Sequence, residues 1–339
     1  MKNLLISISP HIHTKNDTSR VMLDVLIALM PALVAATVIF GSDALLRCLF
    51  SVAACVLLEY LWNKLMKKEQ TVKDLSAAVT GLLLAFNVPA TLPYWELFIG
   101  DVIAIIIVKM LFGGLGCNFV NPALVGRVSL MVSFPADMTN YVTSVAKGTS
   151  AAAAEIVTAA TDAVTGATGA AATVAQTGAD LLTGATPLAI ADKLGSSELM
   201  TLLLGQHGGV LGETCALALL IGGVYLVIRK VIKPLIPLCF MGSCALFTFL
   251  FGGAAPLMSL LMGGMLLGSI FMATDYVTSP ITDKGKVIFG LGCGFLAACT
   301  RCFASAAEGV SFAILLMNLL VPYINEGTRT KPLGGIEAK

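Results

Sequence analysis

Residues 180–187 carry the string DLLTGATP, which leaves one threonine hydroxyl open to chemistry. Gly184 and Ala185 add little bulk beside Thr186, and glycine lets another backbone approach closely. Pro187 biases Thr186 toward an extended conformation, so the hydroxyl is held out of a helix. From residue types alone, this hydroxyl is either a point of covalent modification or a capping or turn group in an Ala/Thr-rich loop.

Ionisable and amide side chains also interrupt several strongly apolar runs. A charge in hydrocarbon is costly, so such residues are functional candidates. Asp101 and Lys109 lie about two helical turns apart and can share one helix face. These groups would line an ion path or contact a bound cofactor; the alternative is internal pairing, or a helix end where the charge reaches water. The candidates are Asp101, Lys109, Asn121, Glu213 and Asp275. For Asp24, Arg47 and Glu308 we expect such ordinary contacts, either internal pairing or a helix-end position.

The chain contains nine cysteines, all in or beside apolar runs. Free cysteine in such a setting is usually a small packing residue. Cys299 and Cys302 form a CxxC string, a spacing also used for metal or iron–sulfur ligation. No second CxxC lies at a matching spacing, so we favour packing and predict no metal site.

The composition places these residues in a membrane protein. Of 339 residues, 57% are hydrophobic and only 12% are charged, with a mean hydropathy of +0.90. A soluble domain carries about 25% charged residues, because its surface is wet. Many uncharged windows reach about 20 residues, the length that crosses ~30 Å of hydrocarbon. The net charge of +1 argues against a nucleic-acid partner.

The apolar runs predict an all-α polytopic membrane protein with about ten transmembrane helices. The expected spans are residues 21–41, 45–63, 75–92, 96–112, 119–135, 210–228, 234–251, 256–273, 286–303 and 308–324. With an even number of crossings, the cationic clusters all fall on the side of both termini, which the positive-inside rule makes cytoplasmic. Those clusters contain Lys64, Lys67, Lys68, Lys73, Arg229, Lys230, Lys233, Lys284, Lys286, Arg329, Lys331 and Lys339.

The longest stretch between spans is then extracytoplasmic and contains more acidic than basic residues. This predicts a cytoplasmic N-terminal tail (1–20), a first membrane half (21–135), an outer loop (136–205), a second membrane half (206–325) and a cytoplasmic C-terminal tail (326–339).

Two of the expected spans end in helix-breaking segments. Residues 87–93 read NVPATLP and residues 274–280 read TDYVTSP. Proline, asparagine and aspartate there free backbone groups, which a membrane tolerates only inside protein or beside a cavity. Five spans separate the two segments, so they run in opposite directions. This pattern predicts two inverted five-helix halves with broken helices and a site at their interface, as in many transporters and channels.

Motifs spread over nearly the whole chain resemble those of the RnfD/NqrB family. They are residues 9–11 (SPH), 112–118 (FGGLGCN), 121–123 (NPA), 180–187, 205–208 (GQHG), 212–213 (GE) and 274–280. In that family a D-x-x-S/T-G-A-T motif accepts FMN through a phosphoester to its last threonine, formed by a separate flavin transferase. The resemblance therefore implies covalent FMN on Thr186. The rest of the acceptor motif is Asp180, Thr183, Gly184 and Ala185.

A similar string, DAVTGATG at residues 162–169, offers Thr168 as a competing acceptor. We prefer Thr186 because Pro-Leu follows it, as in the family, and the next membrane segment begins soon afterwards.

The resemblance also implies a function: the RnfD component of an Rnf-type ferredoxin:NAD oxidoreductase in a bacterial inner membrane. This component would carry electrons coupled to Na⁺ or H⁺ transport. The chain has no dinucleotide fingerprint, so partner subunits bearing flavin and iron–sulfur groups are required. The family implies a urea-channel-like architecture and a second, non-covalent flavin such as riboflavin near spans three to five, where Asn121 lies. The alternatives are a small-solute channel or transporter, and a structural subunit with a vestigial flavin site.

Overall fold

The computed structural model describes residues 17–141, 203, 209–251, 260–261, 264–303 and 309–329. Within these ranges, regular secondary structure is helical, apart from an isolated β-bridge between Pro89 and Val210. Four of the described helices are long and apolar enough to cross a membrane: α1, α2, α14 and α15. The prediction of an all-α polytopic membrane protein is confirmed.

A helix lies within each of the expected spans. The first half consists of α1 (Thr18–Phe40), α2 (Ser42–Leu65), the 3₁₀ turn η1 (Val72–Asp74), α3 (Ser76–Phe86), α4 (Tyr94–Val102), the π-helix η2 (Ile103–Met110), α5 (Pro122–Ser133) and α6 (Pro135–Met138). The second half consists of α10 (Ala216–Ile228), α11 (Leu235–Leu250), α13 (Met265–Leu267), the π-helix η5 (Gly268–Met272), α14 (Asp283–Phe303) and α15 (Gly309–Gly327).

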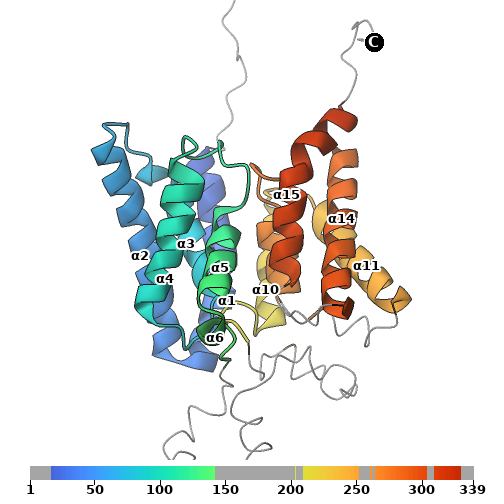
Figure 1. The fold of residues 1–339 in the computed structure, drawn as a ribbon, viewed down its shortest axis with the longest axis horizontal. Coiled ribbons are helices and arrows are strands. Elements are labelled where there is room, and N and C mark those ends of the chain that lie inside the picture. Colours follow the sequence, from blue (N-terminus) through green and yellow to red (C-terminus); the bar gives the residue numbers. More distant parts are fainter. Residues whose placement is uncertain are drawn as a thin grey trace, which may run out of the picture.

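The two halves are inverted copies of one helix arrangement. In Figure 1, α2 rises where its counterpart α11 descends, and α5 descends where α15 rises. Helix α2 packs on α3 and α4, as α11 packs on η5 and α14. Across the interface, α1 packs on α10 and α5 packs on α15, so equivalent helices meet as a two-fold axis in the membrane plane requires. The closer likeness to urea channels stays a prediction.

The broken helices are shorter than the sequence predicted. Helix α3 ends at Phe86 rather than near residue 92, and its 11 residues cover only about 16 Å. Helix α5 begins at Pro122 rather than at residue 119, and α10 begins at Ala216 rather than at residue 210. Prolines and glycines account for the first two boundaries: Pro89 follows α3, and three glycines with positive φ precede α5.

The unwound segments of the two halves pair with each other. The amide of Leu211 donates to the Val88 carbonyl at 3.1 Å, and the amide of Gly212 donates to the Phe86 carbonyl at 2.9 Å. A Cβ on Gly212 would lie 2.4 Å from the Phe86 Cβ, so only glycine permits this approach. Backbone groups freed by the breaks are thus satisfied within the protein, as the membrane requires.

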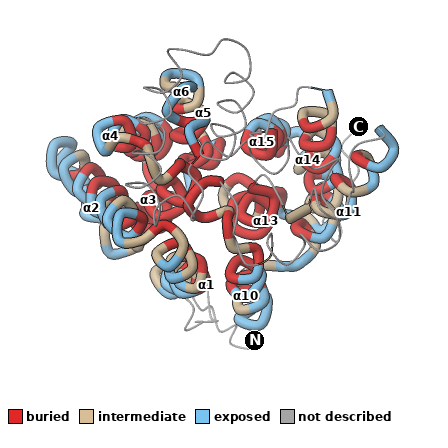
Figure 2. The backbone as a smooth tube through the Cα atoms, turned by 90° about the horizontal axis from the view of Figure 1, so that it is seen from below, coloured by how far each residue is buried: buried red, intermediate tan, exposed pale blue. Residues whose placement is uncertain are grey.

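The short helices form the centre of the bundle. Every residue of α3 and of η5 is buried, whereas α1, α2, α10 and α11 expose large apolar side chains around the perimeter (Figure 2). A chain in water would instead place its polar residues on that perimeter. The outer helices therefore face lipid, and the short helices α3 and η5 lie between them at the centre.

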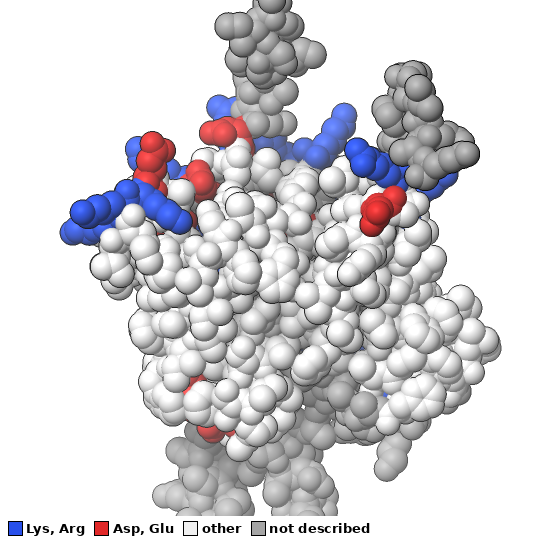
Figure 3. All heavy atoms as spheres, turned by 45° about the horizontal axis from the view of Figure 1, so that its top comes forward, with Lys and Arg blue, Asp and Glu red and all other residues white. Residues whose placement is uncertain are grey.

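Lysine and arginine gather at one end of the bundle. Figure 3 shows this cationic rim above a broad band without charges. Helix α1 begins and α15 ends on the same side (Figure 1), which agrees with an even number of crossings. The tails (1–20 and 326–339) and the outer loop (136–205) lie mostly outside the described residues, so their assignment stays a prediction.

Candidate functional site

The flavin-acceptor motif lies outside the described residues. This applies to Asp180, Thr183, Gly184, Ala185 and Thr186, and to the competing Thr168. Their roles stay predictions. The described site candidates are Asp101, Lys109, Asn121, Glu213 and Asp275.

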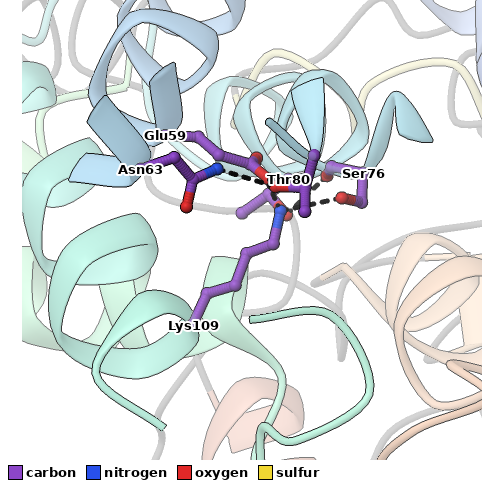
Figure 4. A network of polar contacts seen from close by, with 6 residues as sticks. Glu59, Asn63, Ser76, Thr80 and Lys109 are labelled. Carbon is purple, nitrogen blue, oxygen red and sulfur yellow. Dashed lines mark hydrogen bonds and ion pairs between the residues drawn. The ribbon is translucent and has the colours of Figure 1, made fainter. Parts of the chain in front are cut away.

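A buried ion pair joins η2 to α2 (Figure 4). The Lys109 Nζ lies 2.8 Å from Glu59 Oε2, and the two side chains are 2% and 1% exposed. Lys109 also donates to the Ser76 hydroxyl at 2.8 Å. Thr71 donates to Glu59, and Asn63 donates to Thr71 at 2.9 Å. The pair is therefore enclosed by hydroxyl and amide groups, which a buried charge pair needs to offset its lost hydration.

Helix α2 contributes a polar stripe to this region. Ser51, Cys55, Glu59 and Asn63 follow one another at intervals of four residues, so they lie on one helix face. This face meets α4 and η2. The interval of four within an apolar helix could have revealed this stripe from sequence.

Asp101 of α4 contacts the same stripe at Ser51 and Cys55 and is fully buried. Its Oδ1 accepts hydrogen bonds from Ser51 at 2.6 Å and from Cys55 at 3.2 Å. Its Oδ2 is buried with no hydrogen-bond partner among the described residues. Ser51 also contacts the Gly81 carbonyl at 2.9 Å. The expected shared face of Asp101 and Lys109 is confirmed, because both contact α2.

A cavity opens between the halves, bounded by α1, α3, α5, α10 and residues 271–277. It contains about 780 Å³ of empty space. Its walls are largely apolar, including Val25, Leu83 and Phe271. Its polar lining comprises Ser76, Thr80, Lys109, Asn118, Asn121, Thr274, Asp275 and Tyr276. Three of the predicted site residues thus meet at one cavity, and Lys109 connects it to the α2 stripe.

Asn121 joins the two halves beside this cavity. Its side-chain oxygen caps α5 by accepting from the amides of Ala123 at 3.1 Å and Leu124 at 3.4 Å. Its amide nitrogen donates to the Met272 carbonyl at 3.3 Å, at the end of η5. The segment before α5 is not helical, and the Asn121 side chain accepts from two of the amides that the first turn of α5 leaves free.

Asp275 lies just beyond η5, in the predicted break. It is partly buried and accepts hydrogen bonds from the Thr278 hydroxyl at 3.2 Å and the Val277 amide at 3.5 Å. Burial raises the pKa of its carboxyl, although these hydrogen bonds lower the pKa. Its carboxyl therefore both fastens the turn and lines the cavity.

Glu213 belongs to a second polar cluster, separate from the cavity. A Cβ on Gly264 would lie 3.6 Å from Glu213 Oε2 and 3.6 Å from Arg127 Nη1, so both side chains approach this glycine. Arg127 also donates to Asn87 at 2.6 Å. This cluster fastens the unwound segments of the two halves. The sequence grouped Glu213 with the other candidates, but the structure places it elsewhere.

Asp24 and Arg47 make the ordinary structural contacts expected of them. Asp24 accepts from Arg229 at 3.2 Å and from the Tyr225 hydroxyl at 3.0 Å, which links α1 to α10. Arg47 donates to the Leu92 carbonyl and lies 4.7 Å from the ring centroid of Tyr94. Glu308 lies outside the described residues.

Cys299 and Cys302 are partly buried on α14. In the described part of the chain, no three Cys, His, Asp or Glu side chains are grouped so that they could hold a metal ion.

Comparison with known proteins decides the family. The family model described as "NQR2, RnfD, RnfE family" matches residues 5–334. The chain belongs to the NQR2, RnfD, RnfE family. The suspected resemblance to RnfD and NqrB is thereby confirmed.

Similar members of the NQR2, RnfD, RnfE family match over nearly their full length. The D subunit of the Na⁺-translocating ferredoxin:NAD⁺ oxidoreductase complex of Acetobacterium woodii is 42% identical over 99% of this chain and 97% of its own. The D subunit of the proton-translocating ferredoxin:NAD⁺ oxidoreductase complex of Clostridium ljungdahlii is 36% identical over 98% of this chain and 97% of its own. The D subunit of the ion-translocating oxidoreductase complex of Klebsiella pneumoniae is 36% identical over 97% of this chain and 98% of its own.

All three relatives are named as subunits of oxidoreductase complexes. The comparison therefore does not support the alternative of a small-solute channel or transporter. The first two relatives differ in the ion that their names give, Na⁺ in one and H⁺ in the other.

Proposed function

We propose that this chain is the RnfD component of an ion-translocating ferredoxin:NAD⁺ oxidoreductase complex in a bacterial inner membrane. The observation that carries the proposal is the match, over 97% or more of this chain, to D subunits of three ion-translocating oxidoreductase complexes, two of them named as ferredoxin:NAD⁺ oxidoreductases. The chain contributes to oxidoreductase activity only as part of that complex. Its partners are the subunits that bear further flavins and iron–sulfur clusters, because its own sequence has no dinucleotide-binding fingerprint.

Within the complex, Thr186 holds FMN through a phosphoester. The acceptor motif at residues 180–187 supports this assignment, since it presents a hydroxyl beside small residues and before proline. A flavin transferase makes the bond. When bound, FMN supplies one- and two-electron chemistry. The chain contributes the anchoring hydroxyl and the membrane bundle that carries the loop.

The cavity between the halves suits a second, non-covalent flavin such as riboflavin. Its apolar walls accommodate a flat aromatic ring. The Lys109 ammonium and the side chains of Asn118 and Thr80 offer polar groups to ring carbonyl and nitrogen atoms. Asn121 and Asp275 hold the backbone around this space in place.

The stripe on α2 supports an ion path toward the cationic face. Asp101 provides a buried carboxylate oxygen with no described hydrogen-bond partner, and the Glu59–Lys109 pair lies further along the stripe, beside the buried Asn63 and the partly buried Thr71. Moving one charge against 100 mV costs about 2.3 kcal/mol, which electron transfer must supply. Glu213 lies in the other cluster and acts in fastening the halves.

The orientation follows from the cationic rim. Lysine and arginine at membrane-protein loops favour the cytoplasm. This rim lies on the side where α1 begins and α15 ends (Figures 1 and 3), so both termini are cytoplasmic. The flavin-bearing loop at 136–205 is then extracytoplasmic.

Flavin fluorescence in a denaturing gel tests the covalent bond. The protein is produced together with the flavin transferase, as wild type, Thr186→Ala and Thr168→Ala. We expect fluorescent bands for wild type and Thr168→Ala, and a dark band for Thr186→Ala. Mass spectrometry of the tryptic fragment containing Thr186 should show the added FMN mass. A dark wild-type band, or a fluorescent Thr186→Ala band, would refute the assignment.

A further inference from the structure

A cationic hollow lies on the rim beside the end of α10. Its empty space is about 570 Å³. Three lysines line it from two elements: Lys230 and Lys233 from the α10–α11 connection, and Lys286 from the first turn of α14. Its remaining polar lining is Thr274, Tyr276 and Ser279. The hollow is therefore built for an anionic group rather than for a neutral one.

One carboxylate lies close to these lysines and does not cancel their charge. Asp283 pairs with Lys233 at 2.6 Å, with both side chains more than half exposed. The Asp283 carboxylate also interacts electrostatically with the Lys286 ammonium group. Three ammonium groups against one carboxylate leave the hollow with a net positive charge. Arg229, the next cation along the chain, already pairs with Asp24.

A second hollow lies beside the first. It contains about 650 Å³ of empty space between α10 and α11. These two helices make little direct contact, because α10 packs on α1 and α11 packs on α14. Ile270 of η5 lies at the groove as well. Its apolar lining includes Leu220, Val224, Val227, Ile228, Leu238 and Met241.

The two hollows are adjacent. Ile232, in the α10–α11 connection, lines both of them. From Ile228 the groove follows α10 down to Leu220, about 12 Å along the helix axis. A positive site thus lies beside an apolar groove that opens to lipid.

We propose that this composite site binds an anionic phospholipid, with its phosphate among Lys230, Lys233 and Lys286 and an acyl chain between α10 and α11. Basic pockets between transmembrane helices on the cytoplasmic side are suited to anionic lipid headgroups. Charge complementarity selects the headgroup, and the groove distinguishes a lipid from a soluble anion. This inference does not rest on the flavin proposals, because it is argued from the three lysines and the apolar groove. The cationic hollow shares Thr274 and Tyr276 with the cavity between the halves.

Native mass spectrometry of the full-length chain in detergent tests the proposal. The protein is titrated with dioleoyl phosphatidylglycerol or dioleoyl phosphatidylcholine, which share acyl chains and differ in charge. We expect phosphatidylglycerol to bind at least tenfold more tightly. The double variant Lys230→Gln/Lys286→Gln should lower this affinity about 25-fold, roughly fivefold for each charge. It should weaken phosphatidylcholine binding much less, because the choline cation offsets the phosphate charge of that lipid.

Matched controls separate this site from general attraction to the rim. Lys67→Gln/Lys68→Gln removes two charges from the same rim at the end of α2, far from the groove along the chain, and should change affinity less than twofold. Val227→Trp narrows the groove and should weaken dioleoyl but not dihexanoyl phosphatidylglycerol. Equal binding of the two headgroups, or equal losses in the two lysine variants, would overturn the proposal.

Two further results would also overturn it. Complete displacement of phosphatidylglycerol by inorganic phosphate would mark a site for a soluble anion. A photo-crosslinker at Val224, activated in the assembled complex, should capture lipid. Capture of another subunit there would show that a partner helix occupies the groove.

Discussion

Replacing Lys109 by methionine removes one member of the buried ion pair while keeping the length of the side chain. The Glu59 carboxylate would then lie in the bundle with Thr71 as its remaining described donor. Ser76 would also lose its contact with the Lys109 ammonium at 2.8 Å. The replacement therefore leaves a charge buried without its counter-charge, and we expect a large loss of stability.

The size of that loss follows from the burial of the pair. Side chains that are 2% and 1% exposed have almost no water to restore the lost interaction. Removing one partner of a buried pair costs about 3–5 kcal/mol. At roughly 2–4 °C per kcal/mol, the melting temperature should fall by about 6–20 °C. Glu59→Gln should cost a comparable amount, since it leaves the ammonium uncompensated.

The double variant Glu59→Gln/Lys109→Met decides whether the charges are coupled. With both charges removed, most of the loss should be recovered, because replacing a whole buried pair is often neutral. Thermal unfolding of the purified protein, followed by size-exclusion chromatography with fluorescence detection, measures the effect. Lys68→Met, at an exposed lysine, is the matched control and should change little. If the stability lost in the double variant equals the sum of the losses in the two single variants, the reasoning is refuted.

The remaining predictions concern ion transport, packing and capping. Asp101→Asn should lower ion uptake by proteoliposomes of the complex at least about tenfold, with uncoupled electron transfer retained; unchanged uptake would exclude Asp101 from the path. Gly222→Ala places a Cβ 2.1 Å from the Ala28 carbonyl oxygen. It should lower the free energy of unfolding by about 1–3 kcal/mol. The control Gly242→Ala, with open space around it, should not destabilise the protein. Asn121→Ala should cost about 0.5–2 kcal/mol through the lost cap of α5, and Asn121→Asp should restore part of it; equal stability of the two variants would contradict a capping role.

Hydropathy and charge predicted the fold well because both act locally along the chain. Runs of apolar residues located the described helices, and the positions of the lysines predicted the common side of both chain ends. The breaks were also visible, since Asn87, Pro89 and Asp275 act on their own backbone segments. Helix lengths were less accurate: the apolar run continues past Phe86 although the helix does not, because residues 87–92 are largely buried outside the helix.

The candidate site was predicted only in part. Sequence identified Asp101 and Lys109 as neighbours on one face, because helical spacing relates residues within one element. It did not reveal that Lys109 pairs with Glu59, since the two residues belong to helices separated by other elements of the chain. It also grouped Glu213 with residues that the fold places around a different centre.

The sequence by itself determined that this protein lies in a membrane and how its helices cross it. It also determined the family and the hydroxyl that we propose carries FMN. These properties depend on composition and on short motifs, each readable within a few residues. Only the tertiary structure decided which polar groups meet inside the bundle: the α2 stripe with Asp101 and Lys109, the cavity at Asn121 and Asp275, and the pairing of the two unwound segments. The reason is that a membrane gives every lipid-facing helix surface the same environment, so the packing of distant helices alone selects which faces turn inward.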